Sequence, residues 1–139
     1  MSERTFVDTN VWVYAVDAAD DARRTRALAL LTPSPDSNFV VSTQVLVEFY
    51  VVVTRKLASP LSEDAAQAMV DEIARLPVVP ADADLVTSAM AGSREWRIPL
   101  WDALIVRAAE VAGCTRVLSE DLTHGAVYGS VRVENPFLG

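Results

Sequence analysis

The chain has 139 residues, 51% of them hydrophobic, a length that allows one sizeable core and excludes two ordinary domains, so we expect residues 1–139 to form a single domain. Its single cysteine excludes an internal disulfide, and its single histidine excludes catalysis by paired histidines. The formal net charge of −7 argues against a simple electrostatic RNA-binding module, because phosphate binding usually shows as an excess of basic residues.

Short apolar stretches alternate with helical patterns along the chain. In chain order, the patterns predict a strand at 4–7, helices at 10–16 and 20–31, a strand at 39–41, helices at 42–56 and 62–76, a strand at 77–80, helices at 84–96 and 101–112, and strands at 116–119 and 131–133. Such alternation is typical of βαβ units, which form a parallel sheet covered by helices on both faces. The expected fold class is therefore three-layered α/β.

The segment 42–56 is ambiguous between a strand and a helix. Its central part, 45–53, is rich in valine and aromatic residues, which favour strands. Its length, its basic end and the cap candidates Ser42 and Thr43 favour a helix that is buried on most sides. We therefore predict a helix.

The same stretch, 45–53, is the longest apolar run, and Glu48 interrupts it. It has only about half of the roughly 20 residues that a membrane-spanning helix needs. The first residues also lack the basic start and the uninterrupted apolar run of a signal peptide. We expect no membrane-spanning segment and a cytoplasmic location.

Two acidic residues follow predicted strands. Asp8 comes directly after the strand at 4–7, and Asp121 comes shortly after the strand at 116–119. Ligands of parallel α/β sheets bind beyond the carboxyl ends of the strands, which is where both carboxylates are expected. Each residue also has a purely structural interpretation, because aspartate is common as a helix cap and in turns.

Two further acidic residues lie on predicted helices. Glu48 is the only charge in nine otherwise apolar positions, and burying a lone carboxylate is costly unless a partner or a metal compensates it. Gln44, one turn earlier, could line the same pocket edge as Glu48. The alternative for Glu48 is a surface-facing position. Asp102 lies in the first turn of its helix, where it could equally stabilise the helix dipole.

These four carboxylates together indicate a metal site. Ligands that offer only oxygen atoms suit Mg²⁺ or Mn²⁺ rather than zinc. Crowded carboxylates repel one another, and in the absence of metal they tend to hold a proton. With the four acids set aside, 12 basic and 15 acidic residues leave a balance of −3, which weakens the objection to an RNA ligand.

At these positions the sequence resembles the PIN-domain ribonucleases, and among them the VapC-like toxins of bacterial type II toxin–antitoxin pairs. The matching stretches are Val-Asp-Thr-Asn-Val at 7–11, Glu48, Trp-Asp-Ala-Leu-Ile at 101–105, and Leu-Ser-Glu-Asp-Leu at 118–122 with Gly125 nearby. They run in the family's order from near the start of the chain to near its end.

The resemblance implies a PIN-like α/β/α fold with a parallel sheet of four or five strands. It also implies an endoribonuclease that depends on Mg²⁺ or Mn²⁺, a homodimer, and a separate cognate antitoxin protein that blocks the site. By the same resemblance, Asp8 and Asp102 look like the principal metal ligands, and Glu48 and Asp121 complete the catalytic acidic pocket. Ser119 looks like the small hydroxyl residue that some members place beside this pocket.

Other residues are accessory candidates. Thr9 and Asn10 are cap or turn residues that could also touch metal-bound water or phosphate. Candidates for contact with RNA phosphates are four basic residues, which could instead be solvated surface charges: Arg23, Arg26, Arg55 and Lys56. Three aromatic residues could stack on a base, although core packing is the ordinary role of each: Trp12, Tyr14 and Trp101.

The implied reaction is hydrolysis of an RNA phosphodiester by metal-activated water, which leaves a 5′-phosphate and a 3′-hydroxyl. The main alternative is a catalytically idle PIN-like domain that binds a partner. A phospho-accepting receiver domain needs a lysine after a late strand, whereas the only lysine is Lys56. A phosphatase with two aspartates around one residue is disfavoured because Asn10 stands where the second is needed.

Overall fold

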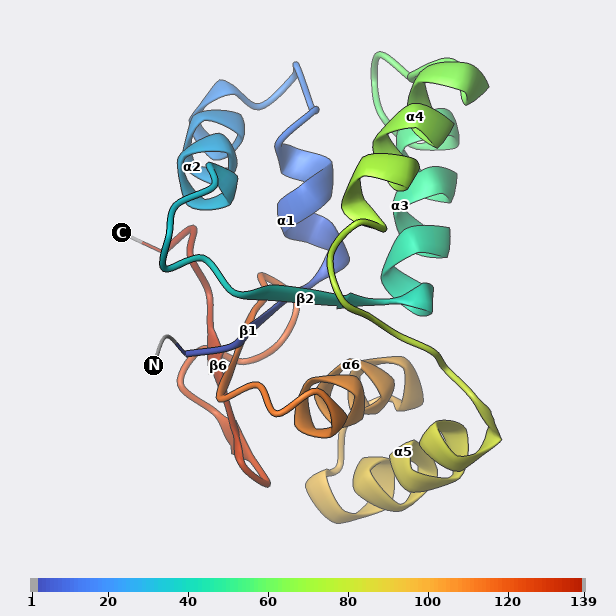
Figure 1. The fold of residues 1–139 in the computed structure, drawn as a ribbon, viewed down its shortest axis with the longest axis vertical. Helices are drawn as coiled ribbons and strands as arrows, with labels where there is room; N and C mark the ends of the chain where they lie inside the picture. The colour runs from blue at the N-terminus through green and yellow to red at the C-terminus, as the bar shows by residue number, and fades with distance from the viewer. Residues whose placement is uncertain (1–2, 139) are drawn as a thin grey trace.

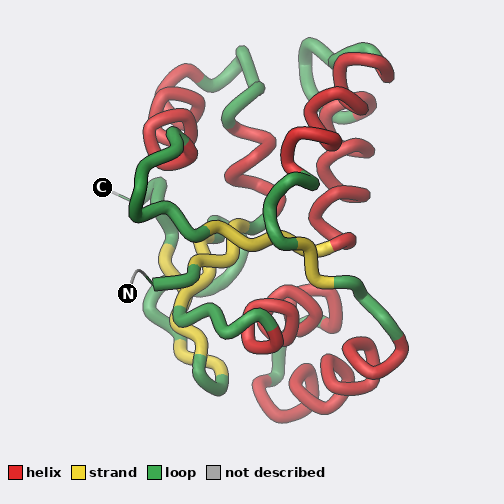
Figure 2. Tube along the Cα trace, in the orientation of Figure 1, coloured by secondary structure: helices red, strands yellow, loops and turns green. Residues whose placement is uncertain are grey.

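The computed structural model describes residues 3–138 of the chain, and Figure 1 shows a central sheet with helices packed on both of its faces. The strands are β1 (Thr5–Val7), β2 (Phe39–Ser42), β3 (Val78–Val79), β4 (Arg116–Leu118), β5 (Val127–Tyr128) and β6 (Val131–Glu134). The helices are α1 (Thr9–Tyr14), α2 (Asp21–Leu31), α3 (Thr43–Arg55), α4 (Glu63–Ile73), α5 (Ala83–Trp96) and α6 (Leu100–Val111). Helices α1–α4 lie on one side of the sheet and α5 and α6 on the other, as the tube in Figure 2 also shows. The three-layer α/β class is confirmed.

The order of the strands in the sheet is β3-β2-β1-β4-β6-β5. Every neighbouring pair is parallel except β5 and β6, which are antiparallel. The sheet has six strands rather than four or five, because the short β5 pairs with β6 through a tight turn. The chain passes outward from β1 through β2 to β3 and then returns to the centre at β4, so the strand order reverses between β1 and β4. The carboxyl ends of these two strands flank the place where such sheets bind ligands.

The central strand β1 is buried on both faces, as expected for a parallel sheet between two helical layers. Phe6 and Val7 are both fully buried. Burying one such aromatic or aliphatic side chain stabilises the fold by about 2 kcal/mol. Asp8 follows at once, so the strand that anchors the core also fixes the first acidic residue at the sheet edge.

The segment 42–56 forms a helix, as predicted, despite its strand-favouring composition. The Ser42 side chain accepts a hydrogen bond from the Val45 amide and caps the first turn of α3. Most residues of the helix are buried or partly buried, as expected, but one side is open, because Val47 and Val51 are 64% and 37% exposed. A fully buried stripe with a four-residue spacing, which includes Val45 and Phe49, faces the core. Within residues 3–138, every helix is too short or too polar to cross a membrane.

Candidate functional site

Four structural elements bring the four predicted acidic residues to the same edge of the sheet. Asp8 is the N-cap of α1 directly after β1, and Asp121 lies in the loop 119–126 after β4. Glu48 lies on α3, and Asp102 lies in the first turn of α6. The charges of Glu48 and Asp121 raise the pKa of both Asp8 and Asp102, so the four carboxylates are close enough to repel one another. We refer to these four residues as the acidic crevice.

Asp8 is the most deeply buried member, with 6% of its surface exposed. One carboxylate oxygen, Oδ1, accepts a hydrogen bond of 2.7 Å from the Thr9 amide, so Asp8 does cap α1. The other oxygen, Oδ2, accepts a hydrogen bond of 2.7 Å from the Ser119 hydroxyl. The capping interpretation and the placement in the crevice are therefore both correct.

Ser119 and Asn10 connect the loop after β4 to the start of α1. Ser119 is fully buried, and its hydroxyl donates a hydrogen bond to the Asp8 carboxylate. The same hydroxyl oxygen accepts hydrogen bonds from the Asp121 and Leu122 backbone amides. The side-chain amide nitrogen of Asn10 donates a hydrogen bond of 3.2 Å to the Asp121 carboxylate. These contacts hold the two carboxylates that follow β1 and β4 in one arrangement.

Glu48 is fixed by polar groups from two elements. Its Oε2 accepts a hydrogen bond of 2.9 Å from the Thr9 hydroxyl, and its Oε1 accepts one of 2.9 Å from the Gln44 side chain. Gln44 also donates to the Trp101 carbonyl at 3.3 Å. Gln44 and Glu48 thus line the same pocket, as expected, and the contacts of Gln44 connect α3 to the start of α6, beside Asp102.

Asp102 differs from the other members because no described group donates a hydrogen bond to its carboxylate within residues 3–138. Partial burial raises its pKa, and the charges of Asp121 and Glu48 raise it further. Its position in the first turn of α6 agrees with the dipole interpretation as well. This carboxylate is therefore oriented without a local hydrogen-bond donor to hold it.

The electrostatics of the crevice favour the capture of a cation. Burial raises the pKa of Asp8 to about 6, against hydrogen bonds from Ser119 and the Thr9 amide, and the charges of Asp121 and Glu48 add to the rise. Among the described residues, no basic side chain forms an ion pair with any of the four acids. The negative charge is compensated only by neutral hydrogen-bond donors.

The donor set of the crevice fits a hard divalent cation, since it offers carboxylate oxygens with hydroxyl and amide groups around them. The arrangement is not preassembled for one ion. Within residues 3–138, no three acidic, histidine or cysteine side chains lie close enough to share a metal. Binding one ion at three or more of these carboxylates therefore requires their side chains to move closer together.

Glu120 is the residue whose role the sequence did not reveal. It is adjacent to Asp121, yet its carboxylate accepts a hydrogen bond of 2.7 Å from Arg23 and another from the Tyr14 hydroxyl. Its amide donates to the Asn10 side chain at 3.1 Å. The two neighbouring acids thus have different contacts, and only Asp121 faces the other crevice carboxylates. Local sequence does not separate them, and only the family resemblance selected Asp121.

The candidate RNA-contacting residues have different surroundings. Arg23 forms ion pairs with Glu120 and Asp20, whereas Arg26, within residues 3–138, donates only to the Pro136 carbonyl at 3.0 Å. Arg55 and Lys56 are exposed at the end of α3.

The three aromatic candidates also differ in exposure. Trp12 and Tyr14 pack against the core, as expected. Trp101 is 66% exposed, so core packing is wrong for it. It lines a pocket of about 700 Å³ together with Glu48 and Lys56.

Comparisons with known proteins agree with this geometry. The model of the PIN domain family matches residues 5–129. VapC20 of Mycobacterium tuberculosis, a toxin that cleaves the sarcin–ricin loop, is 25% identical, with a TM-score of 0.63 over 84% of this chain and 91% of that one.

Two structures with lower identity share the fold. A toxin–antitoxin complex from Klebsiella pneumoniae is 16% identical, with a TM-score of 0.66 over 95% of this chain and 97% of that one. VapBC2 of Rickettsia felis, solved with a DNA fragment from its promoter, is 20% identical, with a TM-score of 0.65 over 95% and 98%. No curated protein sequence matches this chain. Because the family model covers most of its length, the chain belongs to the PIN domain family.

Proposed function

We propose that this protein is a metal-dependent endoribonuclease, formed by residues 1–139 as one PIN domain, that acts as the toxin of a toxin–antitoxin pair. The observation that carries the proposal is the acidic crevice, in which four carboxylates repel one another at the point where the strand order reverses. A divalent cation removes this repulsion. The similarity to VapC20, a toxin that cleaves RNA at the sarcin–ricin loop, supports the choice of RNA as substrate.

The proposed cofactor is Mg²⁺ or Mn²⁺. Asp8 and Asp102 are its principal ligands, and Glu48 and Asp121 complete the site. When bound, such an ion lowers the pKa of a water molecule and stabilises the charge that develops on the phosphate and the leaving oxygen.

The protein groups around the ligands orient the reacting parts. Ser119 and the Thr9 amide hold both oxygens of Asp8 and oppose the rise of its pKa. Glu48 or Asp121 accepts the proton of the attacking water. Because water rather than the ribose 2′-hydroxyl attacks, the products are a 5′-phosphate and a 3′-hydroxyl.

The test compares wild type with Asp8→Asn and Asp102→Asn for cleavage of a structured RNA in Mg²⁺. Each change should lower the rate by more than about a hundredfold, because loss of even an outer-shell partner of a metal ligand costs 10- to 100-fold. Asp71→Asn, on the exposed face of α4, is the matched control and should keep full activity. Unimpaired cleavage by either crevice variant rejects the role of that residue, and a 2′,3′-cyclic phosphate product rejects the mechanism.

The proposed partners are the RNA substrate, a cognate antitoxin and a second copy of the chain, all in the cytoplasm. The toxin–antitoxin complexes among the structural relatives support the antitoxin. A catalytically idle PIN domain would bind the antitoxin but would leave RNA intact in Mg²⁺ and in Mn²⁺, so the cleavage assay separates the two functions.

A further inference from the structure

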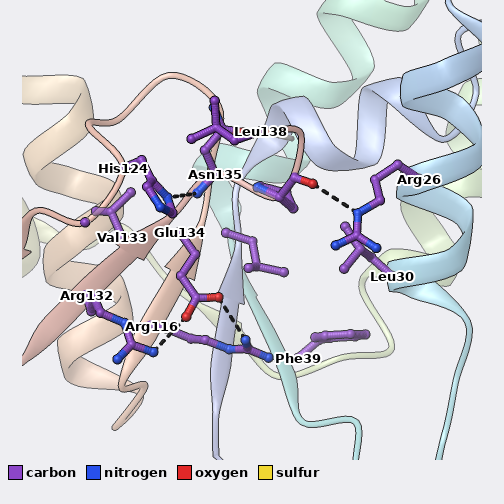
Figure 3. A pocket seen from close by; sticks show the side chains of 13 residues that line it. Arg26, Leu30, Phe39, Arg116, His124, Arg132, Val133, Glu134, Asn135 and Leu138 are labelled. Carbon is purple, nitrogen blue, oxygen red and sulfur yellow. Dashed lines mark hydrogen bonds and ion pairs between the residues drawn. The ribbon is translucent and has the colours of Figure 1, made fainter.

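A second charged feature lies between α2 and the strands β4 and β6. Three arginines from these three elements line a pocket of about 500 Å³, as Figure 3 shows. They are Arg26 on α2, Arg116 at the start of β4 and Arg132 on β6. We refer to this feature as the arginine pocket.

The arginine pocket carries more positive than negative charge. Arg116 and Arg132 occupy paired positions on neighbouring parallel strands, where like charges repel. Glu134 compensates one of them, since it accepts hydrogen bonds of 3.0 Å from Arg116 and 2.7 Å from Arg132. Arg26 forms no ion pair with any described acidic side chain, and its one hydrogen-bond acceptor among the described residues is the neutral Pro136 carbonyl. The lining of the pocket thus contains three guanidinium groups and one carboxylate, in a chain whose net charge is −7.

The arginine pocket and the acidic crevice share the loop 119–126. Ser119 and Asp121 belong to the crevice side of this loop, whereas His124 lines the pocket. Backbone hydrogen bonds hold the loop to β6: the Ser119 amide donates to the Glu134 carbonyl at 3.0 Å, the Gly125 amide donates to the Val133 carbonyl at 2.9 Å, and the Val133 amide donates to the Ala126 carbonyl at 2.9 Å. The distance between the two features is therefore fixed by backbone rather than by mobile side chains.

We propose that the arginine pocket binds a phosphate of the RNA strand on one side of the bond that the crevice cuts, an inference that rests on the proposed endoribonuclease function. Guanidinium groups match phosphate oxygens with paired hydrogen bonds. Apolar side chains of the lining, among them Phe39 and Leu138, offer a surface to a sugar or base. The pocket also answers the objection raised by the acidic composition, because it gathers positive charge in one region of an acidic chain.

The test measures binding of a fluorescein-labelled single-stranded RNA oligonucleotide of mixed sequence by fluorescence anisotropy in EDTA, where no cleavage occurs. The variant is Arg26→Gln with Arg132→Gln, both exposed and outside the crevice. Arg116 is left intact because it also donates to the Thr5 hydroxyl in the core sheet. The matched control, Arg75→Gln with Arg94→Gln, makes the same change in net charge at exposed positions on the surface.

We expect the pocket variant to bind the RNA at least about tenfold more weakly than the control, with an unchanged Tm. Its plot of log affinity against log salt should become shallower by about 0.7 for each phosphate contact that is lost. Equal affinity of variant and control, or no binding by wild type, overturns the proposal. So does arginine-dependent binding of a labelled glutamate-rich peptide without arginine-dependent binding of RNA. Because this assay needs no cleavage, failure of the proposed function appears separately, as uncut RNA in Mg²⁺.

Discussion

The acidic crevice and the arginine pocket treat carboxylates in opposite ways, although one loop joins them. In the crevice, Asp8 is buried among other acids, and its pKa rises to about 6. In the pocket, partial burial of Glu134 is outweighed by hydrogen bonds and charge from Arg132 and Arg116, and its pKa falls below the usual value. Among the described residues, no basic side chain forms an ion pair with the crevice acids, whereas the pocket contains more guanidinium groups than carboxylates.

This contrast shows that the overall acidity of the chain is a poor guide to its ligands. The net charge of −7 is an average over two regions of opposite character. A carboxylate whose pKa is raised by its neighbours indicates a site that gains from an added cation, whereas a carboxylate shared by several arginines indicates the reverse. The contrast can be tested from both sides.

The largest expected effect concerns the stability of the metal-free protein as a function of pH. The folded pKa of Asp8, about 6, lies above the ordinary value of 3.8, so the folded state binds a proton more tightly than the unfolded state. The resulting stabilisation is present below pH 4 and is lost as the pH rises through 6. In EDTA, Asp8→Asn should therefore be more stable than wild type by up to about 3 kcal/mol at pH 8, and the difference should vanish near pH 4.

Urea denaturation across this pH range measures the difference. Asparagine retains the cap of α1, so loss of the cap does not hide the effect. The control Asp71→Asn, on the exposed face of α4, should differ from wild type by only a small amount. A stability difference for Asp8→Asn that does not change with pH would show that the pKa of Asp8 is the same in the folded and unfolded states. It would remove the contrast between the two regions.

The next effect concerns the serine that holds Asp8. Ser119→Ala removes the proton donor of Asp8 and leaves the buried Leu122 amide without its acceptor, so we expect a loss of about 2 kcal/mol in stability. Cleavage should fall by about 10- to 100-fold, as for loss of other partners of metal ligands. Because the Ser119 hydrogen bond lowers the pKa of Asp8, the pH at which stability is lost should also move upward. Ser59→Ala, on an exposed loop, is the control. An unchanged rate together with an unchanged pH profile would contradict this role.

The smallest effect belongs to the arginine pocket. Glu134→Gln removes a partly exposed carboxylate whose folded pKa is lowered, so its contribution to stability is present above the ordinary glutamate pKa of 4.5 and is lost as the pH falls. We expect less than about 1 kcal/mol at pH 7, because solvent screens such pairs. RNA binding should strengthen at the same time, since the pocket becomes more positive. Weaker RNA binding with intact stability would show that Glu134 positions the arginines rather than opposing the phosphate.

Much of the fold and most of the crevice could be predicted from the sequence. Periodicity and caps predicted α3 as a helix against the strand preference of its valines, and acids after strands predicted the sheet edge. The strand β5 was not predicted, because a strand of two residues is too short to show an alternating pattern in the sequence. The exposure of Val47 depends on which stripe of α3 meets the core, which composition does not reveal.

The arginine pocket could not be predicted from the sequence, for a different reason. Arg116 and Arg132 lie at or near the starts of two predicted strands, and this signal becomes informative only when those strands are known to be neighbours in register. Arg26, 90 positions before Arg116, joins them only through the packing of α2. Pairing across a sheet is a property of topology, and local sequence patterns do not contain it.

The hydrogen bond between Ser119 and Asp8 joins residues that are 111 positions apart. A growing chain that ends before β4 already contains Asp8, Glu48 and Asp102, but it still lacks β4 and the Ser119 and Asp121 side chains that follow it. Because such long-range contacts form late, the crevice is completed only after β4 and the loop 119–126 have been synthesised and have folded onto β1. If the chain cuts RNA as proposed, a partly synthesised copy that stops before β4 is therefore inactive.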